Sequence, residues 1–363
     1  MTQTAIPFLF MRGGTSRGPY LNRADLPEDL ESLAEVLIAM VGSGHPLNID
    51  GIGGGNAVTT KVAMLSRSTD DWADVDYFFA QVSVADRTVD FKPTCGNILS
   101  GVGPAAIEMG LIPAREAETT LNIRAVNTGA RVVAKVRTSP DGAIYDGTAS
   151  IDGVPGTAAP VALQFMDTVG GATGALLPTG NLIDTFNGVD VTCMDVAMPM
   201  AIARAETFGL TGYESADTLN ENTAFFAAME AIRIQAGEAM GIANVATSVT
   251  PKFGLLAAAR DGGTIAARYF MPWTAHPAMA VTGAQCLASC ALTPGTVAEG
   301  MAARSNERPA TITLEHASGQ IDVLVDYDLT NDGIDLRSAG LVRTARLLAR
   351  GEVMIPTAIW TKA

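Results

Sequence analysis

Lysine is scarce in this sequence, and negative charge dominates it. Among 363 residues, 24 are basic and 38 are acidic, which gives a net charge of -14. The net charge excludes a general nucleic-acid binder, because neutralising phosphates requires clustered lysine and arginine. With so few lysines, the position of each one is informative. The chain has five: Lys61, Lys92, Lys135, Lys252 and Lys362.

Cysteine and histidine are also few, and they do not cluster. The four cysteines form no CxxC pair, which predicts free thiols in a reducing compartment rather than a disulfide framework. The three histidines are isolated, so we expect no metal site. The residues concerned are Cys95, Cys193, Cys286, Cys290, His45, His276 and His316.

Long apolar runs are absent as well. No stretch reaches the ~18 consecutive apolar residues of a membrane helix. The first residues lack the basic and apolar segments of a secretory signal. We therefore expect a cytoplasmic protein that has no membrane partner.

The composition supports a packed core, and the length predicts two domains. Hydrophobic residues make up 48% and charged residues 17% of the chain. Short β-like runs alternate with a few helical stretches in both halves. We expect strands at 6–11, 19–21, 61–65, 75–84, 191–200, 249–258, 264–270, 311–314, 321–325 and 352–360. We expect helices at 27–41, from 95 to about 110, at 220–240 and at 339–350. A further helix is expected to end at 292, after an entry that begins at 276.

These patterns predict two α+β domains of similar plan, each with one apolar central helix. A segment rich in glycine, threonine and proline, 167–182, is the expected crossover. The predicted domains are 1–182 together with 345–363, and 183–344.

Cys95 stands where an apolar helix is expected to begin. The positive end of a helix and its free N–H groups favour a thiolate. The N–H groups of Gly96 and Asn97 could hold a substrate carboxylate. The alternative is a small apolar residue at the start of a buried helix.

Lys61 opens an apolar strand, where lysine is depleted. A lysine desolvated at the floor of a cleft could act as a base near neutral pH. A solvated lysine at the end of a strand is the alternative.

A glycine-containing turn, Arg12-Gly13-Gly14-Thr15-Ser16, offers close backbone approach and two hydroxyl groups. It suits an anion, although a tight hairpin turn explains it equally well. It lacks the GxxxxGK[ST] spacing of a phosphate-binding loop. The glycines at 51–55 precede a strand and have Asn56 where GxGxxG requires glycine, so a dinucleotide fold is rejected.

In the second half, His276, Thr282 and Gly283 could face Cys95 across a cleft, although a lone histidine before proline is more often structural. Cys286 and Cys290 would share one face of a helix and fit core packing.

Six segments occur in an order that resembles the PrpF-like isomerase family. They are MRGGTSRG (11–18), DGIGG (50–54), TTKVA (59–63), CGNILSGVGPAAIE (95–108), LLPTGN (176–181) and TGAQC (282–286). The likeness spans essentially the whole chain. Two departures are Arg17, where the family often has lysine, and Gly55-Asn56, where close relatives tend to have Ala-Asp.

The resemblance implies the diaminopimelate-epimerase-like fold. That fold has two domains, each a curved, mostly antiparallel sheet around a central helix, with the site in the cleft between them. The C-terminal strand is expected to return to the first domain. The resemblance also implies catalysis without metal or organic cofactor, by a lysine and a cysteine that fall on Lys61 and Cys95.

The implied reaction is the shift of a proton in an unsaturated polycarboxylate. The segments 95–108 and 75–82 are most similar to those of 4-oxalomesaconate tautomerases, which serve gallate and related aromatic-acid breakdown. Lys61 is the expected base and Cys95 the acid, although the roles could exchange. The expected substrate-binding residues are Arg12, Gly14, Thr15, Ser16, Gly96, Asn97, His276, Thr282 and Gly283. Arg17 could add charge.

Three alternatives stay open. The chain could isomerise 2-methylaconitate, aconitate or methylitaconate, or it could be a racemase of the same fold. Racemases of this kind use two opposed cysteines, and Cys286 lies too far along its helix for that role. The third alternative is a non-catalytic protein that binds a tricarboxylate. A homodimer is also compatible with the sequence.

Overall fold

The structure is a computed structural model that describes residues 2–302, 305, 307–330 and 333–362. Its contacts divide the chain into two units. Unit 1 comprises Met1–Leu163 and Val342–Ala363, and unit 2 comprises Gln164–Leu341. The boundaries expected from the sequence, 182/183 and 344/345, both lie later in the chain than the boundaries in the structure, 163/164 and 341/342. Among the described residues, no helix is long and apolar enough to cross a membrane.

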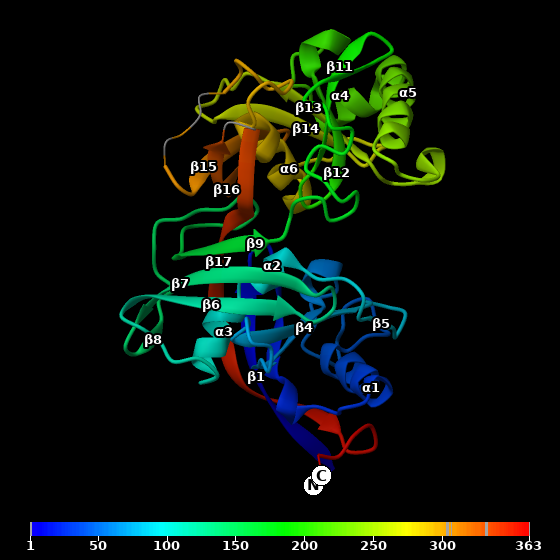
Figure 1. The fold of residues 1–363 in the computed structure, drawn as a ribbon. Coiled ribbons are helices and arrows are strands. Elements are labelled where there is room, and N and C mark those ends of the chain that lie inside the picture. Colours follow the sequence, from blue (N-terminus) through cyan, green and yellow to red (C-terminus); the bar gives the residue numbers. More distant parts are fainter. Residues whose placement is uncertain (1, 303–304, 306, 331–332, 363) are drawn as a thin grey trace. The chain divides into compact units, whose positions relative to one another are not determined.

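Unit 1 contains a mixed sheet and three α-helices (Figure 1). Its elements are β1 (Gln3–Gly13), β2 (Ser16–Asn22), α1 (Leu30–Val41), β3 (Lys61–Arg67), β4 (Val75–Val82), β5 (Val89–Asp90), α2 (Gly96–Leu99), α3 (Val102–Glu108), β6 (Ala117–Ala125), β7 (Ala130–Ser139), β8 (Gly142–Ala143) and the first part of β9 (Pro160–Met166). Two 3₁₀ turns, η1 (Arg23–Asp25) and η2 (Ala57–Thr59), interrupt the loops.

Unit 2 also combines strands with three α-helices. Its elements are β10 (Asp184–Phe186), β11 (Val189–Asp195), β12 (Pro199–Arg204), η3 (Ala205–Phe208), α4 (Ala216–Glu221), α5 (Thr223–Ala239), η4 (Val245–Thr247), β13 (Lys252–Ala257), β14 (Ile265–Phe270), α6 (Val281–Leu292), β15 (Ala310–His316), β16 (Gly319–Thr330) and the start of β17 (Gly333–Pro356).

The two units pair their strands in the same alternating way. In unit 1 the pairs β1–β2, β3–β4 and β6–β7 are antiparallel, and β2–β3 and β4–β6 are parallel. In unit 2 the pairs β11–β12, β13–β14 and β15–β16 are antiparallel, and β12–β13 and β14–β15 are parallel. The expected mostly antiparallel sheets of similar plan are therefore found, and β3 corresponds to β13.

Each sheet surrounds a short apolar helical segment. In unit 2, ten of the twelve residues of α6 are buried, and α6 contacts all six strands from β11 to β16. In unit 1, α2 contacts β1, β2 and β3, while α3 contacts β3, β7 and β8. A helix can bury its whole surface in this way only when strands lie on several sides of it.

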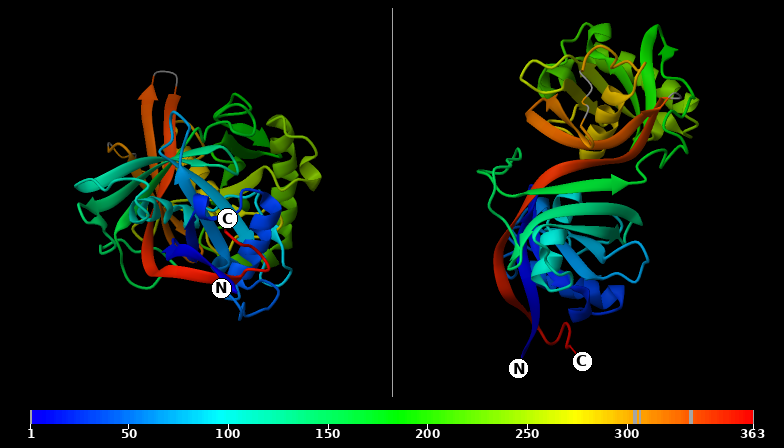
Figure 2. Two further views of the ribbon diagram at one scale, coloured as in Figure 1. Left: turned by 90° about the horizontal axis from the view of Figure 1, so that it is seen from below. Right: turned by 60° about the vertical axis from the view of Figure 1, so that its left-hand side comes forward.

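The helix expected at 339–350 is wrong, because these residues belong to β17. Leucine, alanine and arginine favour a helix, but that preference amounts to only about 0.7 kcal/mol per residue or less. Here the chain pairs with β16 up to Leu341 and with β1 from Ala345 onward. Figure 2 shows β17 running beside β1 in unit 1. The strand expected at 352–360 corresponds to the end of β17, which stops at Pro356, and the expected return of the C-terminal strand to the first unit is confirmed.

The single strand expected at 191–200 is also wrong. The residues form β11 and β12, which pair with Asp195 opposite Pro199. The turn between them contains Ala197 at φ +62°, a conformation for which glycine is the usual signal. The apolar run therefore contains a turn that no glycine marks.

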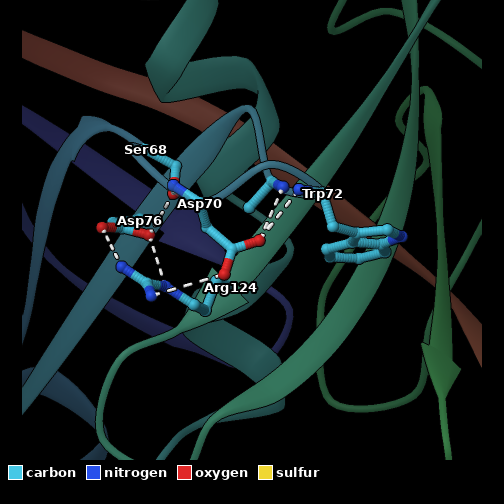
Figure 3. Close-up of polar contacts among 6 residues, drawn as sticks. Ser68, Asp70, Trp72, Asp76 and Arg124 are labelled. Carbon is cyan, nitrogen blue, oxygen red and sulfur yellow. Dashed lines mark hydrogen bonds and ion pairs between the residues drawn. The ribbon is translucent and has the colours of Figure 1, made fainter.

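An ion pair joins β4 to β6 in unit 1 (Figure 3). Arg124 donates two hydrogen bonds to the Asp76 carboxylate, at 2.8 and 2.7 Å. The Ser68 hydroxyl donates to the same carboxylate at 2.8 Å, and Asp70 lies 3.6 Å from the guanidinium. This planar pairing of guanidinium and carboxylate fixes the register of the parallel strands.

A buried arginine organises the loop before β13 in unit 2. Arg233 is fully buried on α5. Its guanidinium donates to Glu230 and to the carbonyl oxygens of Val245, Ser248 and Pro251. One side chain thereby satisfies three carbonyl groups of the loop.

Replacing Arg233 with methionine would leave those carbonyl groups without donors. We expect Arg233→Met to lower the free energy of unfolding by about 3–5 kcal/mol. Urea unfolding followed by circular dichroism measures the change. The exposed Arg67→Met is the control and should change it by less than about 0.5 kcal/mol. Equal stabilities of the two variants would show that Arg233 is not structural.

Candidate active site

Lys61 and Cys95 are in direct contact in unit 1. Lys61 is the first residue of β3, and Cys95 is the N-cap residue of α2. The Nζ atom of Lys61 lies 3.2 Å from the Sγ atom of Cys95. A proton can pass along this contact, so the pair can exist as ammonium and thiolate or as amine and thiol. The structure thus brings together one potential acid and one potential base.

Glycine on β2 allows Lys61 to occupy this position. A Cβ atom at Gly18 would lie 1.7 Å from the carbonyl oxygen of Lys61. Any side chain there would displace the Lys61 backbone. The ammonium group also lies 5.9 Å from the centre of the Phe79 ring, within the range of a cation–π interaction. Gly18 thus leaves room for the Lys61 backbone, and Phe79 flanks its side chain.

Two buried tyrosines hold the single turn of α2. Tyr77 donates to the carbonyl oxygen of Cys95 at 3.3 Å, and Tyr20 donates to that of Ile98 at 2.5 Å. Burial, followed by the charge of Cys95, raises the pKa of both phenols well above 10, so both remain donors. A helix of one turn is not stable alone. No sequence motif identifies these tyrosines, and their strand positions alone did not indicate this role.

The helix expected from 95 to about 110 is interrupted after Leu99 and resumes at Val102. Pro104 explains the break. It has no N–H group, and its ring would clash with the carbonyl group of Ser100 in a continuous helix. The helix dipole at Cys95 therefore comes from one turn. The Nζ atom of Lys61, 3.2 Å from the sulfur, is a second polar neighbour.

The turn between β1 and β2 packs against the start of α2. Gly14 has φ +53°, and a Cβ atom there would lie 2.2 Å from Oδ1 of Asn97. The Thr15 N–H group donates to the same oxygen at 3.4 Å. The structure thus places Gly14, Thr15 and Asn97 together, next to Gly96 and Cys95.

Ser16 completes this turn with an unsatisfied hydroxyl group. Its side chain is 3% exposed. Within the residues that the structure describes, its Oγ atom has no hydrogen-bond partner. An unpaired buried hydroxyl is unfavourable, and a polar ligand could satisfy it.

The two arginines of the turn differ in their contacts. Arg12 donates to the carbonyl oxygens of Gly14 and Thr344, each at 2.9 Å. Burial and the nearby charge of Arg346 lower the pKa of Arg12. Arg12 therefore ties the turn to β17, whereas the exposed Arg17 lies 5.7 Å from the Phe10 ring centre.

The remaining predicted residues belong to unit 2. Thr282 and Gly283 lie in the first turn of α6, and the Thr282 hydroxyl lies 3.6 Å from the sulfur of Met198. His276 accepts a hydrogen bond from the Ala278 N–H group at 3.0 Å. Burial lowers the pKa of His276 below 6.5, so its imidazole is neutral at pH 7.

The other thiols lie in the core. Cys286 is fully buried within α6, and its sulfur lies 3.7 Å from the carbonyl oxygen of Met194. Burial raises the pKa of Cys286, and it raises the pKa values of Cys193 and Cys290 to about 12. These thiols stay protonated near neutral pH, so none of them supplies the thiolate that a racemase with two opposed cysteines needs as its second base. In the described parts of the chain, no group of three or more His, Cys, Asp or Glu residues could hold a metal ion.

A lysine in contact with a thiol, beside a turn with an unpartnered buried hydroxyl among the described residues, is suited to proton transfer. The family model of the PrpF protein matches residues 3–356. The chain therefore belongs to the PrpF family.

The similarity to individual members covers nearly the whole chain. The sequence is 49% identical to YbhH of Escherichia coli (strain K12), over 97% of this chain and 99% of the relative. It is 45% identical to the 4-oxalomesaconate tautomerase of Pseudomonas putida, over 99% of each. The crystal structure of a methylitaconate-delta-isomerase, 33% identical, matches with a TM-score of 0.91 and covers 100% of this chain and 98% of that one.

Adding one methyl group at Gly18 tests how Lys61 is positioned. In Gly18→Ala the new Cβ atom must push the Lys61 backbone away, because the gap is only 1.7 Å. We expect kcat to fall at least tenfold, measured as turnover of the substrate identified by the assay below. Gly171→Ala, where φ is not positive and no atom lies within 4 Å of the new Cβ, is the control. Unchanged turnover in Gly18→Ala would contradict the assigned constraint.

The thiols should differ in reactivity. Iodoacetamide at pH 8 should label Cys95 first in the folded protein, because the raised pKa values of the other three keep them protonated. Peptide mass spectrometry locates the label. Labelling of Cys286 as fast as Cys95 would contradict the burial described above.

Proposed function

We propose that the chain is an isomerase that moves a proton within an unsaturated tricarboxylate, with 4-oxalomesaconate as the substrate, and that it needs no metal or organic cofactor. The contact between Lys61 and Cys95 carries this proposal. The 45% identity to a 4-oxalomesaconate tautomerase, over 99% of both chains, supports the choice of substrate.

The reaction requires a base and an acid near one carbon skeleton. In the proposed mechanism, the Lys61 amine removes a proton from a carbon activated by a conjugated carbonyl group. The Cys95 thiol then returns a proton at a second position of the conjugated system. This leaves an ammonium group and a thiolate. Because the two groups are 3.2 Å apart, the proton can pass directly from Lys61 to Cys95 and restore the starting state.

The dienolate intermediate carries negative charge that must be stabilised. We assign this role to the N–H groups of Gly96 and Asn97 and to the turn of Gly14, Thr15 and Ser16. The hydroxyl of Ser16 is the best supported of these groups, since it is buried and lacks a partner among the described residues. Arg12 acts on the substrate through the turn that it holds.

We further propose that the second unit completes the substrate site, as the resemblance to the fold implies. His276, Thr282 and Gly283 would then bind the part of the substrate that is remote from Lys61. A neutral His276 can donate one hydrogen bond to a carboxylate without adding charge.

The substrate is tested by a panel of 4-oxalomesaconate, 2-methylaconitate, aconitate and methylitaconate, followed by absorbance and by NMR. We expect 4-oxalomesaconate to have the highest kcat/KM. A higher value for methylitaconate would instead favour the activity named for the relative of known structure. Binding without any turnover would indicate a non-catalytic protein.

Removal of either member of the pair should abolish turnover but leave the fold intact. Lys61→Met and Cys95→Ser should each lower kcat by about 10²–10⁴, the range for general acid–base catalysis. Thermal unfolding checks the fold, and Cys290→Ser is the matched control for thiol removal. Near-normal turnover in Lys61→Met would exclude Lys61 as the base.

A further inference from the structure

Unit 2 repeats the arrangement that holds Lys61 in unit 1. Both units alternate antiparallel and parallel pairs in the same order, so β13 corresponds to β3. The first residue of β3 is Lys61, and the first residue of β13 is Lys252. Two of only five lysines therefore occupy equivalent positions.

The segments before the two lysines also match. Gly51-Ile52 precedes Lys61, and Gly241-Ile242 precedes Lys252. Each pair is followed by a 3₁₀ turn whose N-cap residue is asparagine, Asn56 in η2 and Asn244 in η4. The likeness lies in the order of these residues and turns; the caps themselves differ, because Asn56 is extended and its side chain caps η2, whereas Asn244 is left-handed and its side chain makes no cap.

Lys252 also belongs to the face of β13 that is turned toward α6. A Cβ atom at Gly254 would lie 2.7 Å from Leu287 of α6. Side chains alternate along a strand, so Lys252 shares this face with Gly254. The register of Phe253 opposite Phe270 places the end of β14 beside the start of β13. The chain then enters α6, whose first turn contains Thr282 and Gly283, whereas Cys95 is the N-cap residue of α2 and Gly96 its first residue.

The ammonium group of Lys252 has no fixed partner. Across the described residues, no hydrogen bond or ion pair involves its Nζ atom, unlike Lys362, which is 2.6 Å from Asp25. Burial lowers the pKa of Lys252, and the charge of Arg233 acts in the same direction. A partly desolvated ammonium without an acidic neighbour is suited to bind an anion.

We infer that Lys252 is a second substrate-binding cation, which contacts a carboxylate of the polycarboxylate substrate from unit 2 as the counterpart of Lys61. The first turn of α6 contains Thr282 and no cysteine, so unit 2 has the cation without a thiol at the start of this helix. Lys252 then binds charge, and proton transfer stays with Lys61 and Cys95. This inference rests on the proposed function in assuming that both units contribute to the substrate site.

The test uses the full-length protein and trans-aconitate as the probe, with its Kd measured by calorimetry at low salt. Losing a hydrogen bond to a charged group should weaken binding by about tenfold to a hundredfold in Lys252→Met. Lys252→Arg keeps the charge and should stay within about threefold of the unsubstituted protein. Lys135→Met, which removes a lysine from β7, is the matched control and should leave Kd unchanged.

Turnover separates this inference from the proposed function. With a substrate that is turned over, Lys252→Met should raise KM by at least tenfold and lower kcat much less, whereas Lys61→Met should lower kcat. Weaker trans-aconitate binding in Lys252→Met, without turnover by the unsubstituted protein, would retain the inference and reject the isomerase. A Kd and KM within twofold of normal in Lys252→Met, or no binding of trans-aconitate by the unsubstituted protein, would overturn the inference.

Discussion

The close approach of backbone segments around β2 is the constraint on which the site depends. Gly18 lets β2 lie against the Lys61 carbonyl, and Gly14 lets the preceding turn lie against Asn97. Lys61 and Cys95 are far apart in the chain, and these approaches bring the start of β3 and the start of α2 together. A side chain at either glycine would move one of the two groups that must stay in contact.

The contact itself explains why a lysine and a cysteine suffice for a proton shift. After one catalytic cycle the base carries an extra proton and the acid lacks one. Two groups at hydrogen-bonding distance can exchange that proton directly. The buried phenols of Tyr20 and Tyr77 hold the carbonyl groups of the short helix that carries the thiol. The core thiols of unit 2 are protonated, which leaves one reactive cysteine and disfavours racemisation by two opposed cysteines.

The sequence indicated the residues of the candidate site more readily than the residues that hold them in place. Scarce lysine, a cysteine before Gly96 and a turn with two glycines were visible as residue types, and the order of motifs identified the family. Tyr20 and Tyr77 were missed because a buried tyrosine in a strand has no distinctive spacing. The equivalence of Lys252 to Lys61 was missed because it becomes evident only when the strand pairings are known.

The errors in the expected fold have physical causes. Residues 339–350 favour a helix by composition, but pairing with β16 and β1 outweighs that local preference. Pro104 marks the break between α2 and α3, and this break could have been predicted from the sequence. The turn at Ala197 carries no glycine and gave no signal.

Deuterium exchange measures the central claim most directly. In D₂O, with 4-oxalomesaconate followed by NMR, Cys95→Ser should still exchange the proton that Lys61 removes, while forming product at least a hundredfold more slowly. Lys61→Met should neither exchange that proton nor form product. Exchange at the normal rate in Lys61→Met would contradict the account, because the proton would then be removed by another group.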